Sequence, residues 1–138
     1  SKDSMQVPWL LTVADKFGTA KHIGPGGNLW SNVHIQDLTD LYCLALKEAP
    51  SGSFYFAENG ENSMREVCES INTMMGVNSP PLSMTIAEAS VEWGESPSNH
   101  TMGSNSRVRA KRARLELGWD PKAGSLINEI KYGCYSRH

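Results

Sequence analysis

Apolar residues recur at helical spacing in the first part of the chain. Gly18 follows the last of them, and glycine often ends a helix because it adopts left-handed backbone without steric cost. Pro8 suits the first turn of a helix, where its missing N–H leaves no hydrogen bond unmade. The spacing therefore predicts an amphipathic helix ending near Gly18. Its apolar face consists of Val7, Leu10, Leu11, Ala14 and Phe17.

Two capping boxes, in which a hydroxyl residue is followed three positions later by glutamate, predict the start of two further helices. Ser63 with Glu66 precedes an apolar face that reaches Met75, and Thr85 with Glu88 precedes a shorter helix ending near Gly94. The first of these faces is rich in methionine. At helical spacing such a stripe is explained better by core packing than by a pliable binding groove.

The remaining pattern alternates short strands with helices. Strands are predicted at 21–23, 32–35 and 53–57, the last of them buried; helices at 36–48, 106–117 and 126–133; and a polar loop at 95–104. Gly118 is expected to cap the second of these helices. The predicted fold class is α/β, a small sheet of short strands with several amphipathic helices, forming one domain over 1–138. A sheet this small is expected to pair with an element outside the chain.

Composition narrows the classes of partner. The 138 residues carry a net charge of −2, with 39% hydrophobic and 20% charged residues, and no apolar run approaches the length of a membrane span. We therefore expect no nucleic acid and no membrane as partner. Cys43, Cys68 and Cys134 are odd in number and lack C-x-x-C spacing, which argues against a disulfide framework and a zinc site and favours the cytoplasm.

Five segments in order resemble the extended short-chain dehydrogenase/reductase family, also called the NAD-dependent epimerase/dehydratase family. Segment 33–40 (Val-His-Ile-Gln-Asp-Leu-Thr-Asp) resembles the family's V-H-V-x-D-L-A-D, and 54–58 resembles its V-Y-N-V-G strand. Segment 117–121 (Leu-Gly-Trp-Asp-Pro) is similar to the terminal L-G-W-x-P. Segments 3–8 and 63–76 match the stretch after the family's Y-G-P loop and the helix after its V-Y-N-V-G strand.

The resemblance implies that these residues are the C-terminal, substrate-binding portion of a Rossmann-type enzyme. NAD or NADP would be bound by an N-terminal domain absent from this chain, which would also supply the family's Tyr and Lys pair. Tyr42, Tyr55 and Tyr132 each lack a lysine four positions later, so we expect no catalysis by these residues alone. The glycines of 24–27 are read as a turn, since no third glycine follows at the dinucleotide-binding spacing.

The resemblance also implies a pocket for a small-molecule substrate. The residues expected to shape it are Met5, Gln6, Trp9, His22, Trp30, Asn32 and Arg107, the last as an anion contact. Many epimerases of the family place an arginine where Trp30 stands, and no arginine occurs between Arg65 and Arg107. A flatter, less charged substrate stacking on Trp30 is therefore at least as plausible as a sugar nucleotide.

Other chemistry-bearing residues have structural explanations that we prefer. We expect His34 to be packed and hydrogen-bonded rather than catalytic, and Asp37 and Asp40 to favour a helix N-terminus. The spacing of His34 and Asp37 lacks a third metal ligand. The basic run 107–114 is expected to be a solvated helix face, with Arg112 pairing with Glu116.

The leading functional hypothesis is thus the substrate-binding portion of an NAD(P)-dependent epimerase/dehydratase-like oxidoreductase. One alternative is a non-catalytic ligand or redox sensor on the same fold. Another is a free-standing interaction module. The expected partners are the N-terminal cofactor-binding domain, a small-molecule substrate and a second copy in a homodimer.

Overall fold

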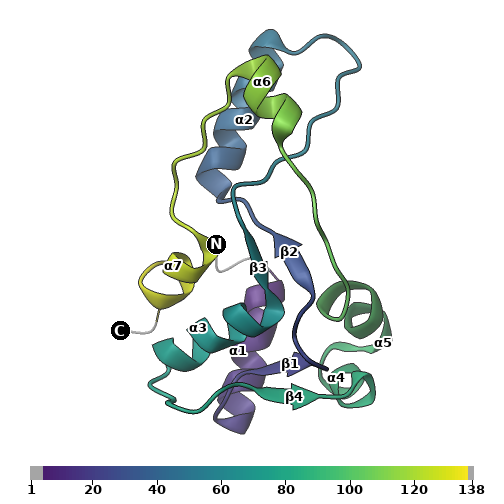
Figure 1. The fold of residues 1–138 in the computed structure, drawn as a ribbon, viewed down its shortest axis with the longest axis vertical. Helices are drawn as coiled ribbons and strands as arrows, with labels where there is room; N and C mark the ends of the chain where they lie inside the picture. The colour runs from purple at the N-terminus through teal and green to yellow at the C-terminus, as the bar shows by residue number, and fades with distance from the viewer. Residues whose placement is uncertain (1–4, 137–138) are drawn as a thin grey trace.

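The structure is a computed structural model, and residues 5–136 are described here. It is elongated, with most elements gathered at one end and two helices at the other (Figure 1). The larger part, here the α1–α3 lobe, contains α1 (Gln6–Phe17), β1 (Lys21–Ile23), α3 (Met64–Met74), β4 (Leu82–Met84), α4 (Ile86–Trp93), α5 (Glu95–Pro97), the π-helical turn η1 (Ser98–Met102) and α7 (Leu126–Lys131). The smaller part, the α2–α6 lobe, contains α2 (Ile35–Glu48) and α6 (Lys111–Leu117).

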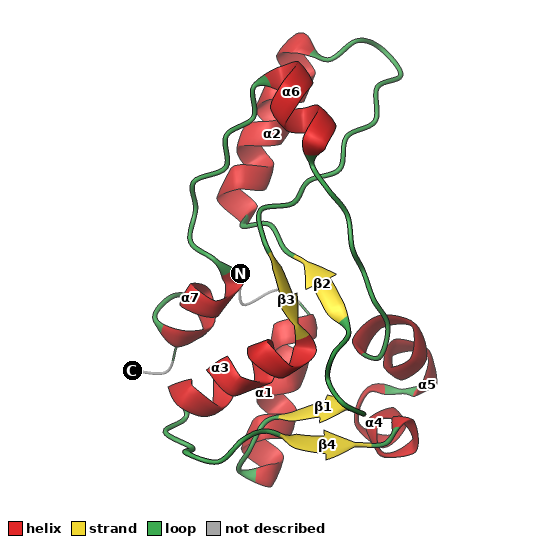
Figure 2. Ribbon diagram, in the orientation of Figure 1, coloured by secondary structure: helices red, strands yellow, loops and turns green. Residues whose placement is uncertain are grey.

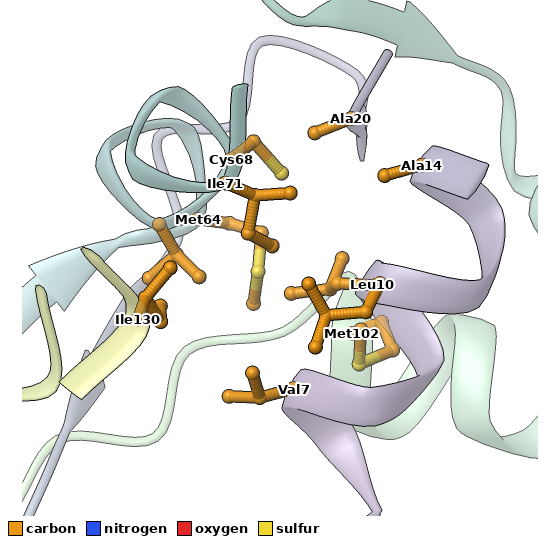
Figure 3. Close-up of a cluster of buried hydrophobic side chains, with 11 residues drawn as sticks. Val7, Leu10, Ala14, Ala20, Met64, Cys68, Ile71, Met102 and Ile130 are labelled. Atoms are coloured by element: carbon orange, nitrogen blue, oxygen red, sulfur yellow. The ribbon is translucent and has the colours of Figure 1, made fainter. Parts of the chain in front are cut away.

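The core of the α1–α3 lobe lies between α1, α3 and α7. Leu10, Met64 and Ile71 are fully buried there, and Ile130 of α7 closes one side (Figure 3). The predicted apolar faces of α1 and α3 are thereby confirmed, except that Phe17 is 43% exposed. Both capping boxes are present, and Gly18 ends α1 in left-handed backbone at φ 69°.

A second cluster holds the α2–α6 lobe together. Leu41 of α2 packs with Ala113 and Leu117 of α6, and Trp119 follows directly after α6. The Trp119 Nε1–H donates to the carbonyl oxygen of Asp37 at 2.8 Å. Gly118 caps α6 at φ 61°, as predicted.

The strands form two separate pairs (Figure 2). β1 is parallel to β4, whereas β2 (Leu29–Ser31) is antiparallel to β3 (Glu61–Ser63). The predicted α/β class with short strands and several helices is confirmed, and so is the strand at 21–23. The strand predicted at 32–35 is misplaced, because β2 ends at Ser31 and His34 already caps α2.

The prediction of a buried strand at 53–57 is wrong. The segment alternates in burial like a strand, with Tyr55 and Ala57 packed on the α2–α6 lobe, but no strand within residues 5–136 pairs with it. Phe54 and Phe56 point away and are 63% and 48% exposed. Sequence alternation thus identified which face packs and could not supply a pairing partner.

Two further expectations need correction. The polar stretch 95–104 is not a loop but α5 and η1, and Ser98 and Met102 within it are buried. The helix predicted from 106 begins only at Lys111, because Ser106 pairs with Trp30 of β2. Arg107 therefore does not share a helix face with Lys111.

In the described part of the chain, no helix has the length and apolar character that crossing a membrane requires.

Candidate functional site

A cavity of about 480 Å³ opens where the two lobes meet. Its wall combines the start of α1, the strand β2 with the residues after it, η1 with the segment that follows, and the chain around α7. The lining residues on which the argument below depends are Gln6, Trp30, Asn32, His34, Ser104 and Glu129. The volume lies within the range of ordinary small-molecule sites.

Trp30 forms one wall and is held from several directions. Its backbone belongs to β2, between β3 and the bridge to Ser106, and its indole Nε1–H donates to the carbonyl oxygen of Ser104 at 3.0 Å. The indole is half-buried, so part of its face remains available to the cavity. A tethered aromatic ring of this kind is a rigid platform for a planar or apolar ligand.

Asn32 is also fixed by its neighbours. Its side-chain nitrogen donates to the carbonyl oxygen of Trp30 at 3.2 Å and to Oδ1 of Asn62 at 3.0 Å. Its backbone N–H donates to Gly60, and its carbonyl accepts from Asn59, which also lines the cavity. These bonds replace the strand predicted here and turn the chain toward α2.

His34 and Glu129 are neighbours in the wall of the cavity. His34 caps α2, since its Nδ1 accepts the Gln36 N–H at 3.2 Å, and its Nε2 lies 3.9 Å from Oε1 of Glu129. The hydrogen-bonded histidine that we expected is thus present, although as a helix cap rather than on a strand. The Cys134 N–H donates to Oε2 of Glu129 at 3.1 Å, and this bond, assisted by His34, lowers the pKa of Glu129.

Three of the seven residues expected to shape a pocket line this cavity. Gln6, Trp30 and Asn32 do so; Met5, Trp9, His22 and Arg107 do not. Met5 is 60% exposed ahead of α1, and Trp9 packs against the core. Substrate binding by any of the seven stays a prediction.

The remaining two residues, His22 and Arg107, have hydrogen-bond partners outside the cavity. His22 is 3% exposed, its Nδ1 lies 3.0 Å from the carbonyl oxygen of Gly24, and burial lowers its pKa. Arg107 forms a bidentate pair with Glu61, at 2.7 and 3.0 Å, and Arg109 binds the same carboxylate at 3.0 Å. An arginine engaged in this way is a poor candidate for the anion contact that we expected.

Glu129, His100 and Ser104 line the cavity and were missed by sequence reasoning. The sequence analysis predicted a polar loop for the segment that contains His100 and Ser104. It placed Glu129 in the predicted helix 126–133 and gave it no role in a site. All three reach the cavity through contacts distant in sequence. No local pattern in the sequence distinguishes these three residues from other polar positions.

The glycine-rich turn does not fit a dinucleotide pyrophosphate. Such a site needs a strand, a glycine turn and then a helix whose N-terminal N–H groups face the phosphates. Here the turn after β1 leads into β2, and Gly26 lies against the ring of His22. The predicted turn is present, with the Gly26 N–H donating to the carbonyl oxygen of Ile23 at 3.1 Å.

The described residues also hold no group of three or more His, Cys, Asp or Glu side chains suited to a metal ion. Asp37 turns away from His34 and accepts the backbone N–H groups of Lys122 and Ala123. The three cysteines form no disulfide, and burial raises the pKa of Cys68 to about 12. Cys43 lies in a helix as predicted, but it is exposed.

The elements define the class as an α/β protein with a few short strands and several helices, and this fold is similar to those of two solved structures. The chain is similar to the crystal structure of dTDP-glucose 4,6-dehydratase from Bacillus anthracis in complex with NAD, with a TM-score of 0.64 and 21% identity over 86% of this chain and 34% of that one. It is also similar to the crystal structure of gox2253, with a TM-score of 0.60 and 16% identity over 87% and 40% of the two chains.

The sequence relatives, like the solved structures, are matched over less than half of their own length. The chain is 29% identical to an uncharacterized protein of Schizosaccharomyces pombe, over 96% of this chain and 44% of that protein. It is 26% identical to the oxidase ucsJ of an Acremonium species, over 83% and 38%, respectively. No protein-family model matches the chain. The chain thus spans less than half the length of these relatives.

Proposed function

We propose that these residues are the substrate-binding portion of an NAD(P)-dependent, epimerase/dehydratase-like oxidoreductase. In this proposal the nicotinamide cofactor is held by residues outside 1–138, and the cavity beside Trp30 receives the substrate. The observation that carries the proposal is this cavity, bounded by a tethered indole and by polar groups, within a fold similar to that of an NAD-complexed dehydratase.

The segment 53–57 supports the proposal that a separate cofactor-binding domain contacts these residues. Its exposed edges lack a partner strand in the described residues, and Phe54 and Phe56 stack edge-to-face at 4.9 Å on the outer face. An exposed segment without a pairing partner that carries two exposed aromatic rings is a typical site for docking of another element. We propose that a cofactor-binding domain docks here, pairing with the segment and covering both rings.

Titration with NADH and NADPH tests the proposal. The natural full-length protein is expected to bind one of them with micromolar affinity and to enhance its fluorescence, whereas residues 1–138 alone are expected to bind neither. Binding of the nucleotide by 1–138 alone, or by neither form, would contradict the division of roles. Nucleotide binding by a full-length protein that lacks a Tyr/Lys pair would instead favour the sensor.

A further inference from the structure

The charges around the cavity point to a definite class of ligand. Within the described lining, Glu129 is the one carboxylate, and neither lysine nor arginine contributes. The other titratable side chains facing the cavity are His34, His100, Cys134 and Tyr135, none of which is a permanent cation.

The carboxylate of Glu129 is built into the wall. The Cys134 N–H binds one oxygen, and a Cβ atom at Gly133 would collide with the carboxylate, so the turn after α7 packs directly against it. The other oxygen, Oε1, lies 3.9 Å from His34, beyond hydrogen-bond distance, and the side chain remains 25% exposed. The Cys134 side chain also hydrogen-bonds to this carboxylate, so Glu129 is an oriented anion that is partly exposed in the wall of the cavity.

The nearest arginines on the β2–β3 side are committed to other partners. Arg107 and Arg109 converge on Glu61, and Arg114 donates to the carbonyl oxygen of Glu58 at 2.9 Å. Recruiting Arg107 to an anionic ligand would require a bidentate ion pair to break. The cavity therefore presents a negative charge that neither a lysine nor an arginine compensates within the described lining.

We propose that this cavity binds a small molecule with a planar apolar face and a protonated amine, the face lying on Trp30 and the amine on Glu129, and that it excludes phosphates and carboxylates. This inference rests on the proposed function, because it takes the cavity to be the substrate site. An ammonium group near Glu129 is attracted, whereas an anion at the same position is repelled in a partly desolvated setting.

Three phenyl compounds that differ in charge test the inference: phenethylamine, 2-phenylethanol and phenylacetate, with inorganic pyrophosphate as a diphosphate probe. Binding to the natural full-length protein is measured by ligand-observed NMR at pH 8, above the range in which imidazoles ordinarily become protonated. Phenethylamine is expected to bind at least about tenfold more tightly than phenylacetate, with 2-phenylethanol between them and no binding of pyrophosphate.

Substitutions test which residues produce the preference for the amine. Glu129→Gln keeps an acceptor for the Cys134 N–H and is expected to abolish the preference for the amine without loss of 2-phenylethanol binding. Trp30→Leu is expected to weaken all three phenyl compounds. Glu48→Gln, at an exposed site on α2, is the matched control and is expected to leave the series unchanged.

The outcomes separate this inference from the proposed function. Phenylacetate or pyrophosphate binding as tightly as phenethylamine, or none of the phenyl compounds binding, would overturn it. A protein that binds NADPH yet prefers phenylacetate would overturn this inference alone. A protein that prefers phenethylamine yet binds no nicotinamide nucleotide would overturn only the proposed function.

Discussion

At the scale of single residues, Asp37 both lies in the first turn of a helix and holds a distant loop by hydrogen bonds. Sequence reasoning assigned it to the helix dipole, and it does lie in the first turn of α2. Its carboxylate, however, is buried and accepts the backbone N–H groups of Lys122 and Ala123 at 2.9 and 3.1 Å. It therefore fixes the chain that runs from α6 back toward α7 and the cavity.

Asp37→Ala is expected to lower the free energy of unfolding by about 2 kcal/mol, because it leaves backbone donors without their charged acceptor. Urea unfolding measures this change. Asp40→Ala, at an exposed position on the same helix, is the control and is expected to change stability by no more than about 0.5 kcal/mol. Equal effects of the two substitutions would show that Asp37 acts only through the helix dipole.

At the scale of elements, local signals located most of the helices but only one of the three predicted strands, the strand at 21–23. Caps and apolar spacing located α1, α3 and α4 because each helix satisfies its own backbone hydrogen bonds. The strand β2 ends at Ser31, and Asn32 after it bonds to Asn59, Gly60 and Asn62, which are all distant in sequence. The cavity was only partly predictable for the same reason: Trp30 and Asn32 stand near a recognisable motif, but Glu129 meets them only through tertiary packing.

One ion-pair cluster ties the segment before α6 to β3. Arg107 and Arg109 lower the pKa of Glu61 from its ordinary value of 4.5 to about 2. Since the folded-state pKa is depressed, the stabilisation is present above the unfolded value near 4.5 and is lost as the pH falls through about 2. The segment should therefore loosen in strong acid.

The carboxyl resonance of Glu61 is expected to titrate at about pH 2, as followed by carbon-detected NMR. Replacing both Arg107 and Arg109 by glutamine should move the midpoint back up toward 4.5, because both causes of the shift are removed. High salt should raise it in the same direction by screening. A midpoint near 4.5 in the unaltered protein would show that the cluster does not persist in solution.

At the scale of the molecule, the α2–α6 lobe exposes several large apolar side chains. Its cluster is small, and Phe54, Phe56, Leu46 and Leu115 are exposed around it. The relatives are more than twice as long, and this surface is where our proposal places the docking of a cofactor-binding domain. The cavity lies at the junction of this lobe with the α1–α3 lobe, so docking would also determine how the cavity is closed.

Hydrogen exchange of residues 53–57 tests this central proposal most directly. Backbone amides are compared between residues 1–138 alone and the natural full-length protein, with the α3 core amides of Cys68 and Ile71 as internal references. The proposal predicts rapid exchange at Tyr55 and Phe56 in the shorter chain and protection by at least about a hundredfold in the full-length protein, since strand pairing buries their N–H groups. Equally rapid exchange in both proteins would contradict the docking of a cofactor-binding domain on this segment.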